Sequence, residues 1–315
     1  MTELAFPRTE VSPDRRPRLG YAMTLAAATL FAVNGTVSKV ILSTGISSLR
    51  LTELRTTGGF LGLVLGLLLL APKRLRLTRR EVPFLLFYGI CGFALVQWLY
   101  FVAIHRLPIG IGLLLEFTAP VLVALWARFA WHEPVRRRVW AALALSLGGL
   151  GLVAEIWSGL ALDGIGVVAG LVDAVALAVY FLLGERGVGR RDPLSLVCYS
   201  LLFAGLFWAV TQPWWSFPFW QLQGSTSLHG HFAGTALPLW ALYAWLVVLG
   251  TIAPFALSIG ALRHLPATTV GIVATFEPVA ASVVAWVWLG ESLDAAQLGG
   301  GAVVLAGIVL AETAR

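Results

Sequence analysis

The sequence predicts an all-α integral membrane protein with ten transmembrane helices, arranged as two inverted five-helix repeats. The chain of 315 residues is 58% hydrophobic and 12% charged, far more apolar than a soluble domain. Its apolar runs are about twenty residues long, the length that a helix needs to cross a hydrocarbon core of about 30 Å. The third observation is an internal sequence repeat.

The repeat has a period of 158 positions, which is the separation of Leu107 from Leu265. Five predicted spans precede the second copy, and because five is odd, the two copies enter the membrane from opposite sides. Such inverted repeats are typical of transporters, whose halves rock around a shared midplane site to give alternating access. The repeated residues are Leu107-Pro108, Pro120-Val121, Glu133 and Gly149, which return as Leu265-Pro266, Pro278-Val279, Glu291 and Gly307.

The first repeat is predicted at 19–157 and the second at 161–312, with residues 158–160 joining them outside. A polar cytoplasmic tail at 1–18 precedes them, and because it lacks a cleavage signal, we expect the first span to be retained. In chain order the ten spans are predicted at 19–42, 49–71, 82–104, 108–129, 137–157, 161–183, 193–212, 238–262, 266–289 and 294–312.

The distribution of Lys and Arg predicts the orientation. With the N-terminus in the cytoplasm, most basic residues fall in inner segments such as 73–80 and 136–138, whereas the long outer segment 213–237 contains none. Basic loops stay on the cytoplasmic side, so both termini are predicted there and the lipid bilayer is the cytoplasmic membrane. The net charge of +6 therefore reflects orientation, and we predict no nucleic-acid partner.

Several features are interpreted as structural. Cys91 and Cys198 lie within spans and show no metal-ligand spacing, so we predict neither a metal nor a cofactor. Glu133 and Glu291 are expected to cap helix ends. The aromatic segment 213–237 is interpreted as an anchor at the membrane interface, with a substrate lid as the alternative.

Small residues dominate the fifth and tenth spans. Glycines let helix backbones approach closely, so these spans are expected to be peripheral packing helices, and a homodimer contact is one role for them. The glycines concerned are Gly148, Gly149, Gly151, Gly299, Gly300, Gly301 and Gly307.

Pro120 and Pro278 interrupt two spans at matching positions. Proline removes a backbone hydrogen bond and kinks a helix. At membrane depth the freed backbone groups persist only against neighbouring protein or a wet cavity. Paired kinks in two inverted repeats are therefore the best pointer in this sequence to a substrate site.

Three acidic residues at membrane depth are functional candidates, because an ionisable side chain there is costly. Glu116 lies one helical turn before Pro120 and Glu277 directly precedes Pro278, so we expect both to converge on one cavity. A carboxyl group in such a cavity suits proton binding and release, which predicts the proton as coupling ion. The alternative is a bond to backbone amides freed by each proline. Asp173, in the sixth span, is left open between cavity and helix-packing roles.

Other polar residues in the spans offer directional hydrogen bonds to a small polar substrate, and helix-to-helix bonding is the alternative for each. They are Asn34, Gln97, Tyr100, Thr118 and Tyr180. Arg55, near the outer end of the second span, is expected either to bind a substrate carboxylate or to join a surface ion network with residues such as Glu53.

The runs around the two prolines resemble a known family over nearly the whole chain: the drug/metabolite transporter superfamily, in its EamA-type ten-helix branch. The first half is similar to the threonine/homoserine exporter group of that branch. The chain departs from the family at Asn34-Gly35, where a Trp-Gly pair is usual, and in its long segment 213–237. The runs are Leu107-Pro108-Ile109-Gly110-Ile111, Leu115-Glu116-Phe117-Thr118-Ala119-Pro120-Val121, Thr275-Phe276-Glu277-Pro278-Val279 and Leu289-Gly290-Glu291.

This resemblance implies a central cavity lined mainly by helices 1 to 4 and 6 to 9, with helices 5 and 10 outside. It also implies export of amino acids or other small metabolites, commonly by proton exchange. We therefore predict a secondary exporter rather than an enzyme, with Glu116 and Glu277 as substrate and proton sites. One alternative is an exporter of cationic drugs. Another is a membrane-embedded lipid-modifying enzyme, although the sequence has no HExxH or GxSxG motif.

Overall fold

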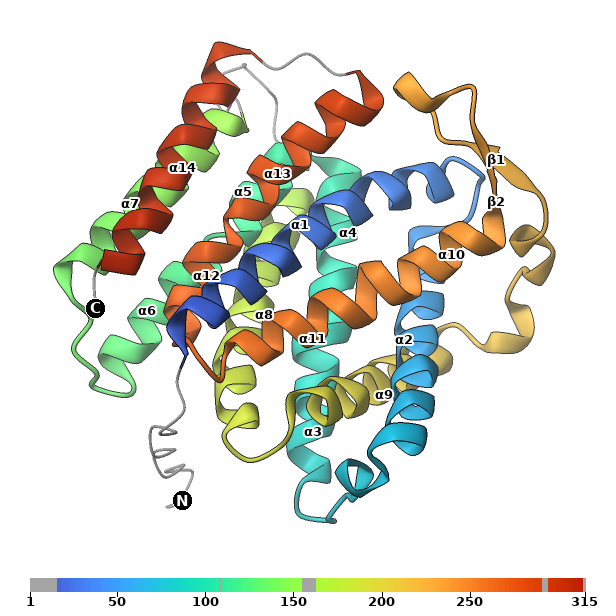
Figure 1. Cartoon of the computed structure of the whole chain (residues 1–315), viewed down its shortest axis with the longest axis horizontal. Helices are drawn as coiled ribbons and strands as arrows, with labels where there is room; N and C mark the ends of the chain where they lie inside the picture. The colour runs from blue at the N-terminus through green and yellow to red at the C-terminus, as the bar shows by residue number, and fades with distance from the viewer. Residues whose placement is uncertain (1–15, 108, 155–162, 291–293, 314–315) are drawn as a thin grey trace.

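The computed structural model describes residues 16–107, 109–154, 163–290 and 294–313, and most of these residues are helical (Figure 1). Within them the chain has the predicted all-α membrane fold of ten helical spans. Nine spans are at least 18 residues long and apolar enough to cross a membrane, and α7, with 17 residues, is the tenth. Residues 1–15 of the tail, the junction 158–160, Pro108 and Glu291 lie outside the described residues.

The first repeat has three continuous spans and two interrupted ones. A short 3-10 helix, η1 (Pro72–Leu75), follows the second span. In chain order the spans are α1 (Pro17–Leu42), α2 (Ser48–Leu70), α3 (Val82–Tyr88) with η2 (Gly89–Ala94) and α4 (Leu95–Arg106), α5 (Ile109–Glu116) with α6 (Ala119–Phe129), and α7 (Arg137–Val153).

The second repeat has the same pattern of continuous and interrupted spans. Its first helix is longer than predicted and continues past residue 183 to Val188, and Gly184 and Gly187 in this last part pack closely against Leu262 and Leu196. The spans are α8 (Gly164–Val188), α9 (Pro193–Thr211), α10 (Leu239–Val247) with η6 (Val248–Ile252) and α11 (Ala253–Ala261), α12 (Ala267–Ala274) with α13 (Phe276–Val284) and η7 (Ala285–Leu289), and α14 (Ala295–Thr313).

The interruptions recur at matching positions of the two repeats. The segments η2 and η6 are π-helical turns, each in the middle of the third span of its repeat. Both fourth spans break beside a proline, and at each break a threonine hydroxyl donates back into the preceding turn: Thr118 Oγ1 to Leu115 O and Thr275 Oγ1 to Ile272 O, both at 2.6 Å. Such local irregularities in a helix are frequent at functional sites.

The segment between α9 and α10, predicted to lie outside, folds on the ends of other helices. It contains three short 3-10 helices and the antiparallel hairpin of β1 (Ser225–Ser227) and β2 (Ala236–Pro238). Phe217 is buried in an apolar cluster with Val37 and Ile41 of α1. Trp288 Nε1 donates to Leu228 O at 2.8 Å, so the segment is joined to η7. The 3-10 helices are η3 (Trp214–Ser216), η4 (Phe219–Leu222) and η5 (Gly230–Phe232).

Helices α7 and α14 lie side by side at one edge of the bundle (Figure 1). A Cβ atom at Gly149 would lie 2.7 Å from Gly300 O, and one at Gly300 would lie 2.6 Å from Gly149 O. A third glycine of the predicted stripe, Gly307, meets Ser146 in the same way. These glycines therefore pack the two helices against each other within one chain, while the homodimer contact stays a prediction.

We expect Gly149→Ala to destabilise the protein by about 1–3 kcal/mol, because the added methyl group overpacks a backbone-to-backbone contact. Gly148 is the matched control, since a Cβ atom there meets nothing within 4 Å. Thermal unfolding of the two variants in the same detergent, followed by circular dichroism, measures the difference. Equal unfolding temperatures would show that the α7–α14 contact tolerates a larger separation.

Candidate functional site

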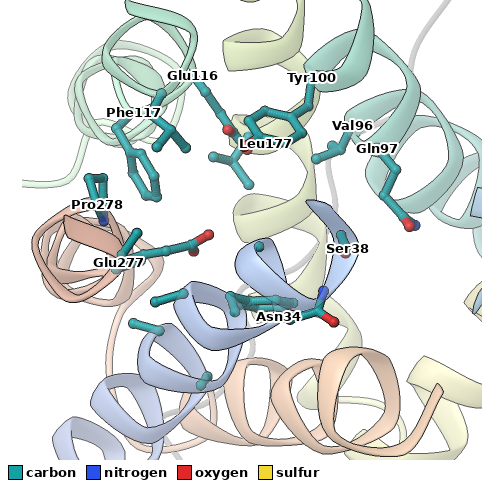
Figure 2. Close-up of a pocket in the computed structure, with 18 of the residues that line it drawn as sticks. Asn34, Ser38, Val96, Gln97, Tyr100, Glu116, Phe117, Leu177, Glu277 and Pro278 are labelled. Carbon is teal, nitrogen blue, oxygen red and sulfur yellow. The ribbon is translucent and has the colours of Figure 1, made fainter. Parts of the chain in front are cut away.

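A cavity of about 450 Å³ lies in the middle of the bundle, between the two repeats. This volume is within the range of about 300–1,000 Å³ that is usual for small-molecule sites. Residues from both repeats line it, and its wall combines aromatic rings with polar side chains (Figure 2). The polar side chains are Thr24, Asn34, Thr36, Ser38, Lys39, Arg55, Gln97, Tyr100, Glu116, Tyr180, Ser258, Glu277, Ser282 and Gln297.

Glu116 and Glu277 both line this cavity, one from each repeat. Glu116 is the last residue of α5, at the break before α6, and Glu277 lies in the first turn of α13 beside Pro278. Figure 2 shows their side chains reaching into the same space from different helices. Both are half-buried rather than exposed. The helix breaks therefore place two carboxyl groups in one chamber, away from lipid.

Arg55 is held in the cavity wall by the π-helical turn of the other repeat. Its side chain is 8% exposed, and it donates from Nε to Thr251 Oγ1 at 3.1 Å and from Nη2 to Gly250 O at 2.9 Å. The Thr251 hydroxyl in turn donates to Leu246 O at 2.9 Å. The guanidinium group is thus held by two neutral acceptors, and no carboxylate of the described residues forms a salt bridge with it.

The ion network that the sequence suggests for this region excludes Arg55. Glu53 Oε2 accepts from Arg50 Nη1 at 2.6 Å, and Arg50 Nη2 also donates to Ser216 Oγ at 2.6 Å. Arg50, paired with Glu53, therefore connects α2 to the segment between α9 and α10. Arg55 lines the cavity instead, and its binding of a substrate carboxylate stays a prediction.

Asn34 and Gln97 present amide groups at the cavity. Asn34 packs against Gly250, where a Cβ atom would fall 2.0 Å from Asn34 Oδ1. Gln97 Nε2 donates to Phe93 O at 2.8 Å, in the π-helical turn η2. Among the described residues neither Asn34 Oδ1 nor Gln97 Oε1 has a hydrogen-bond partner. Both oxygens are buried inside the protein rather than open to the cavity, and buried polar atoms are rarely left unpaired.

An aromatic cluster closes one side of the cavity. Tyr180 and Phe255 line it, and the Phe93 ring lies 5.4 Å from that of Tyr180 and 4.7 Å from that of Phe255. Tyr88 packs behind them and donates from its hydroxyl to Tyr180 O at 3.1 Å. The lining continues on the other side to Leu42 and Leu289, at the ends of α1 and η7. The cavity therefore extends from the aromatic cluster towards that end of the bundle.

The remaining predicted residues divide into two groups. Tyr100 lines the cavity, as does Pro278. Asp173, Thr118 and Pro120 are not among the lining residues.

Each of these three residues has a different environment. Asp173 is fully buried in α8, and within the described part of the chain neither of its carboxylate oxygens has a partner. The Thr118 hydroxyl is bonded to its own helix, and Pro120 packs against Gly271 of α12.

Several lining residues were not predicted from the sequence, among them Ser38, Lys39, Ser258 and Ser282. One signal was available for Ser38, which follows Asn34 by four residues and so lies on the same face of α1. No comparable spacing marks Ser258 or Ser282, because each stands alone in an apolar run.

Comparison with known proteins agrees with this architecture. Residues 18–154 and 164–313 each match the EamA-like transporter family. The threonine/homoserine exporter RhtA of Escherichia coli is 30% identical over 255 residues, which cover 81% of this chain and 76% of the exporter. An uncharacterized transporter of Archaeoglobus fulgidus is 29% identical over 93% of this chain and 96% of its own length.

A solved crystal structure has the same fold. It superposes with a TM-score of 0.72 and covers 93% of this chain and 96% of its own, at 20% sequence identity. At this identity the likeness concerns the fold alone.

Proposed function

We propose, from the premise that this chain belongs to the EamA-like transporter family, that it is a proton-coupled secondary exporter of small amino acids or related metabolites. It would work in the cytoplasmic membrane, with both termini in the cytoplasm, by alternating access between its two repeats. The similarity to a threonine/homoserine exporter supports an amino acid as substrate.

The single observation that carries the proposal is the charge pattern of the central cavity. Two carboxyl groups, Glu116 and Glu277, share this cavity with one guanidinium group, Arg55. An amino acid carries both an ammonium and a carboxylate group, so it finds an opposite charge for each in one chamber. Asn34 and Gln97 also line the cavity, and rotation of their amide groups would add donors and acceptors for a polar substrate.

Proton coupling is proposed from the same two acids. Both lie at membrane depth, where ionisable side chains mark proton relays and substrate pathways. One carboxyl group can exchange its proton as the substrate leaves, while the other holds the ammonium group. Proton entry in exchange for substrate would then drive export.

Purified protein in liposomes tests this function directly. We expect an imposed proton gradient to drive radiolabelled threonine or homoserine across the membrane, and an ionophore that collapses the gradient to stop it. Protein-free liposomes are the control. Flux that is equal with and without the gradient would contradict coupling, and absence of flux for all amino acids would contradict the substrate class.

An exporter of cationic drugs is the alternative within the same fold, because two acids and several aromatic rings also suit a cation. The position of Arg55 in the cavity wall argues against it, since a buried guanidinium group repels a cationic ligand. Competition in the same liposomes separates the two: a cationic drug that inhibits threonine flux while itself being transported favours the alternative. The family and the named relatives are transporters, which leaves the enzyme alternative without support from them.

A further inference from the structure

A second charged feature lies far from the cavity, in the loop between α2 and α3. This loop, residues 71–81, contains the helix η1 and five basic side chains that are all exposed. They are Lys73, Arg74, Arg76, Arg79 and Arg80. We refer to residues 71–81 as the basic loop.

The backbone of the basic loop is fixed by side chains of α9 and the turn before it. Arg191, whose side chain is 8% exposed, donates from Nη2 to Arg76 O at 2.8 Å. Ser195 Oγ donates to Arg74 O at 2.6 Å, and the Tyr199 hydroxyl donates to Leu75 O. Successive carbonyl groups of the loop therefore face α9. A loop that turns its carbonyl groups inward presents its side chains outward.

The carboxylate of the basic loop, that of Glu81, already accepts hydrogen bonds within the protein. Glu81 accepts from Arg191 Nη1 at 2.8 Å and from the amide and hydroxyl groups of Thr78 at 2.9 and 2.8 Å. Partial burial raises the pKa of Glu81, but the hydrogen bonds from Thr78 and Arg191 outweigh it, so the pKa lies below its usual value. Glu81 thus stays ionised at neutral pH and holds the loop in place.

Four cations of the basic loop have no ion-pair partner among the residues that the structure describes. Arg74 pairs with Asp192 at 3.3 Å, whereas among the described residues no carboxylate pairs with Lys73, Arg76, Arg79 or Arg80. Directly before the loop, Leu69 and Leu70 at the end of α2 are 74% and 88% exposed. These leucines belong to a membrane span and face lipid, so the four cations lie beside the level of lipid headgroups.

We propose that the basic loop is a binding site for the phosphate headgroups of anionic phospholipids. Clustered basic side chains next to a membrane span attract anionic lipid, and guanidinium groups bind phosphate oxygens in bidentate geometry. The orientation rule for membrane proteins accounts for basic residues in an inner loop. The orientation rule does not require the backbone of the loop to be fixed. It also does not explain why the buried side chain of Arg191 donates to carbonyl groups of the loop.

The test is a lipid titration of the detergent-purified full chain, read by native mass spectrometry and by unfolding temperature. We expect phosphatidylglycerol to remain bound and to raise the unfolding temperature, and phosphatidylcholine to do neither. The quadruple variant Lys73→Gln/Arg76→Gln/Arg79→Gln/Arg80→Gln is expected to lose about tenfold or more in apparent affinity for phosphatidylglycerol. Because the four side chains are exposed, its unfolding temperature in detergent alone should match the wild type.

A second basic loop provides the matched control. Residues 136–138 are three consecutive arginines at the start of α7, and their triple glutamine variant should keep the wild-type affinity for phosphatidylglycerol. Equal affinity in the wild type and the quadruple variant would overturn the proposal, as would equal loss in both variants. The third measurement uses inorganic phosphate in place of lipid. If phosphate raised the unfolding temperature as much as phosphatidylglycerol does, the site would bind a soluble phosphate and the lipid assignment would be overturned.

Discussion

Replacing Glu116 by glutamine is expected to abolish transport driven by a proton gradient. Glutamine keeps the size of the side chain at the break after α5 and one of its acceptor oxygens, but it carries an amide NH2 group in place of the other oxygen and cannot bind and release a proton. Because Glu277 also lines the cavity and remains to hold the ammonium group, the substrate can still enter and bind. The variant should therefore show substrate flux down its own gradient while flux driven by protons falls to the level of protein-free liposomes.

Glu133→Gln is the matched control for this prediction, since Glu133 is exposed in the loop after α6. It should transport like the wild type. The companion variant Glu277→Gln tests the second carboxyl group, and it should weaken binding of amines as well as transport. Undiminished proton-driven flux in Glu116→Gln, at an unchanged unfolding temperature, would remove Glu116 from the coupling mechanism.

The fold could be predicted from the sequence because the sequence signals for it are strong and repeated. Apolar runs of membrane length have few structural alternatives, and the recurrence of Leu107-Pro108 as Leu265-Pro266 fixed the relation between the halves. The sites of the two acids followed from the same signals, since each acid lies beside a proline that interrupts a span. A carboxyl group next to a broken helix in an apolar sequence needs a polar neighbourhood.

The rest of the site depends on contacts between residues far apart in the chain. The partners of Arg55 are Gly250 O and Thr251 Oγ1, almost 200 positions away, and the π-helical turn that presents them has no distinct sequence pattern. Asp173 resembles the other intramembrane acids in sequence, yet it faces the interior between helices instead of the cavity. Which face of an apolar helix meets the cavity cannot be deduced when every face is apolar.

The two short strands could not be predicted from the sequence for a related reason. The strands Ser225–Ser227 and Ala236–Pro238 have three residues each and no alternation of apolar and polar side chains. Contacts between the hairpin and other parts of the chain stabilise the pairing, among them the hydrogen bond from the Trp288 side chain to Leu228 O. Tertiary contacts, rather than local propensity, decide such elements.

Arg55→Gln is expected to weaken the binding of carboxylate-bearing substrates selectively. A hydrogen bond to a charged group contributes about 1.5–3 kcal/mol, which corresponds to roughly a 10- to 100-fold loss of affinity. Threonine should lose this factor, whereas threoninol, the amino alcohol that has no carboxylate, should bind the variant as well as it binds the wild type. Ligand-induced stabilisation of the purified protein measures both affinities.

Two further variants separate charge recognition from structural support. Arg50→Gln removes a guanidinium group on the same helix that is bonded to Glu53 and Ser216 outside the cavity lining, so it should not change the ratio of the two affinities. Thr251→Val removes the acceptor of Arg55 Nε but leaves the charge in place, and its loss for threonine should be smaller than that of Arg55→Gln. If Arg55→Gln weakened threonine and threoninol equally, Arg55 would support the π-helical turn η6 without recognising the carboxylate. The charged groups left for recognition in the cavity lining would then be its two acids and Lys39, and the case for an amino acid over a cation would lose its main support.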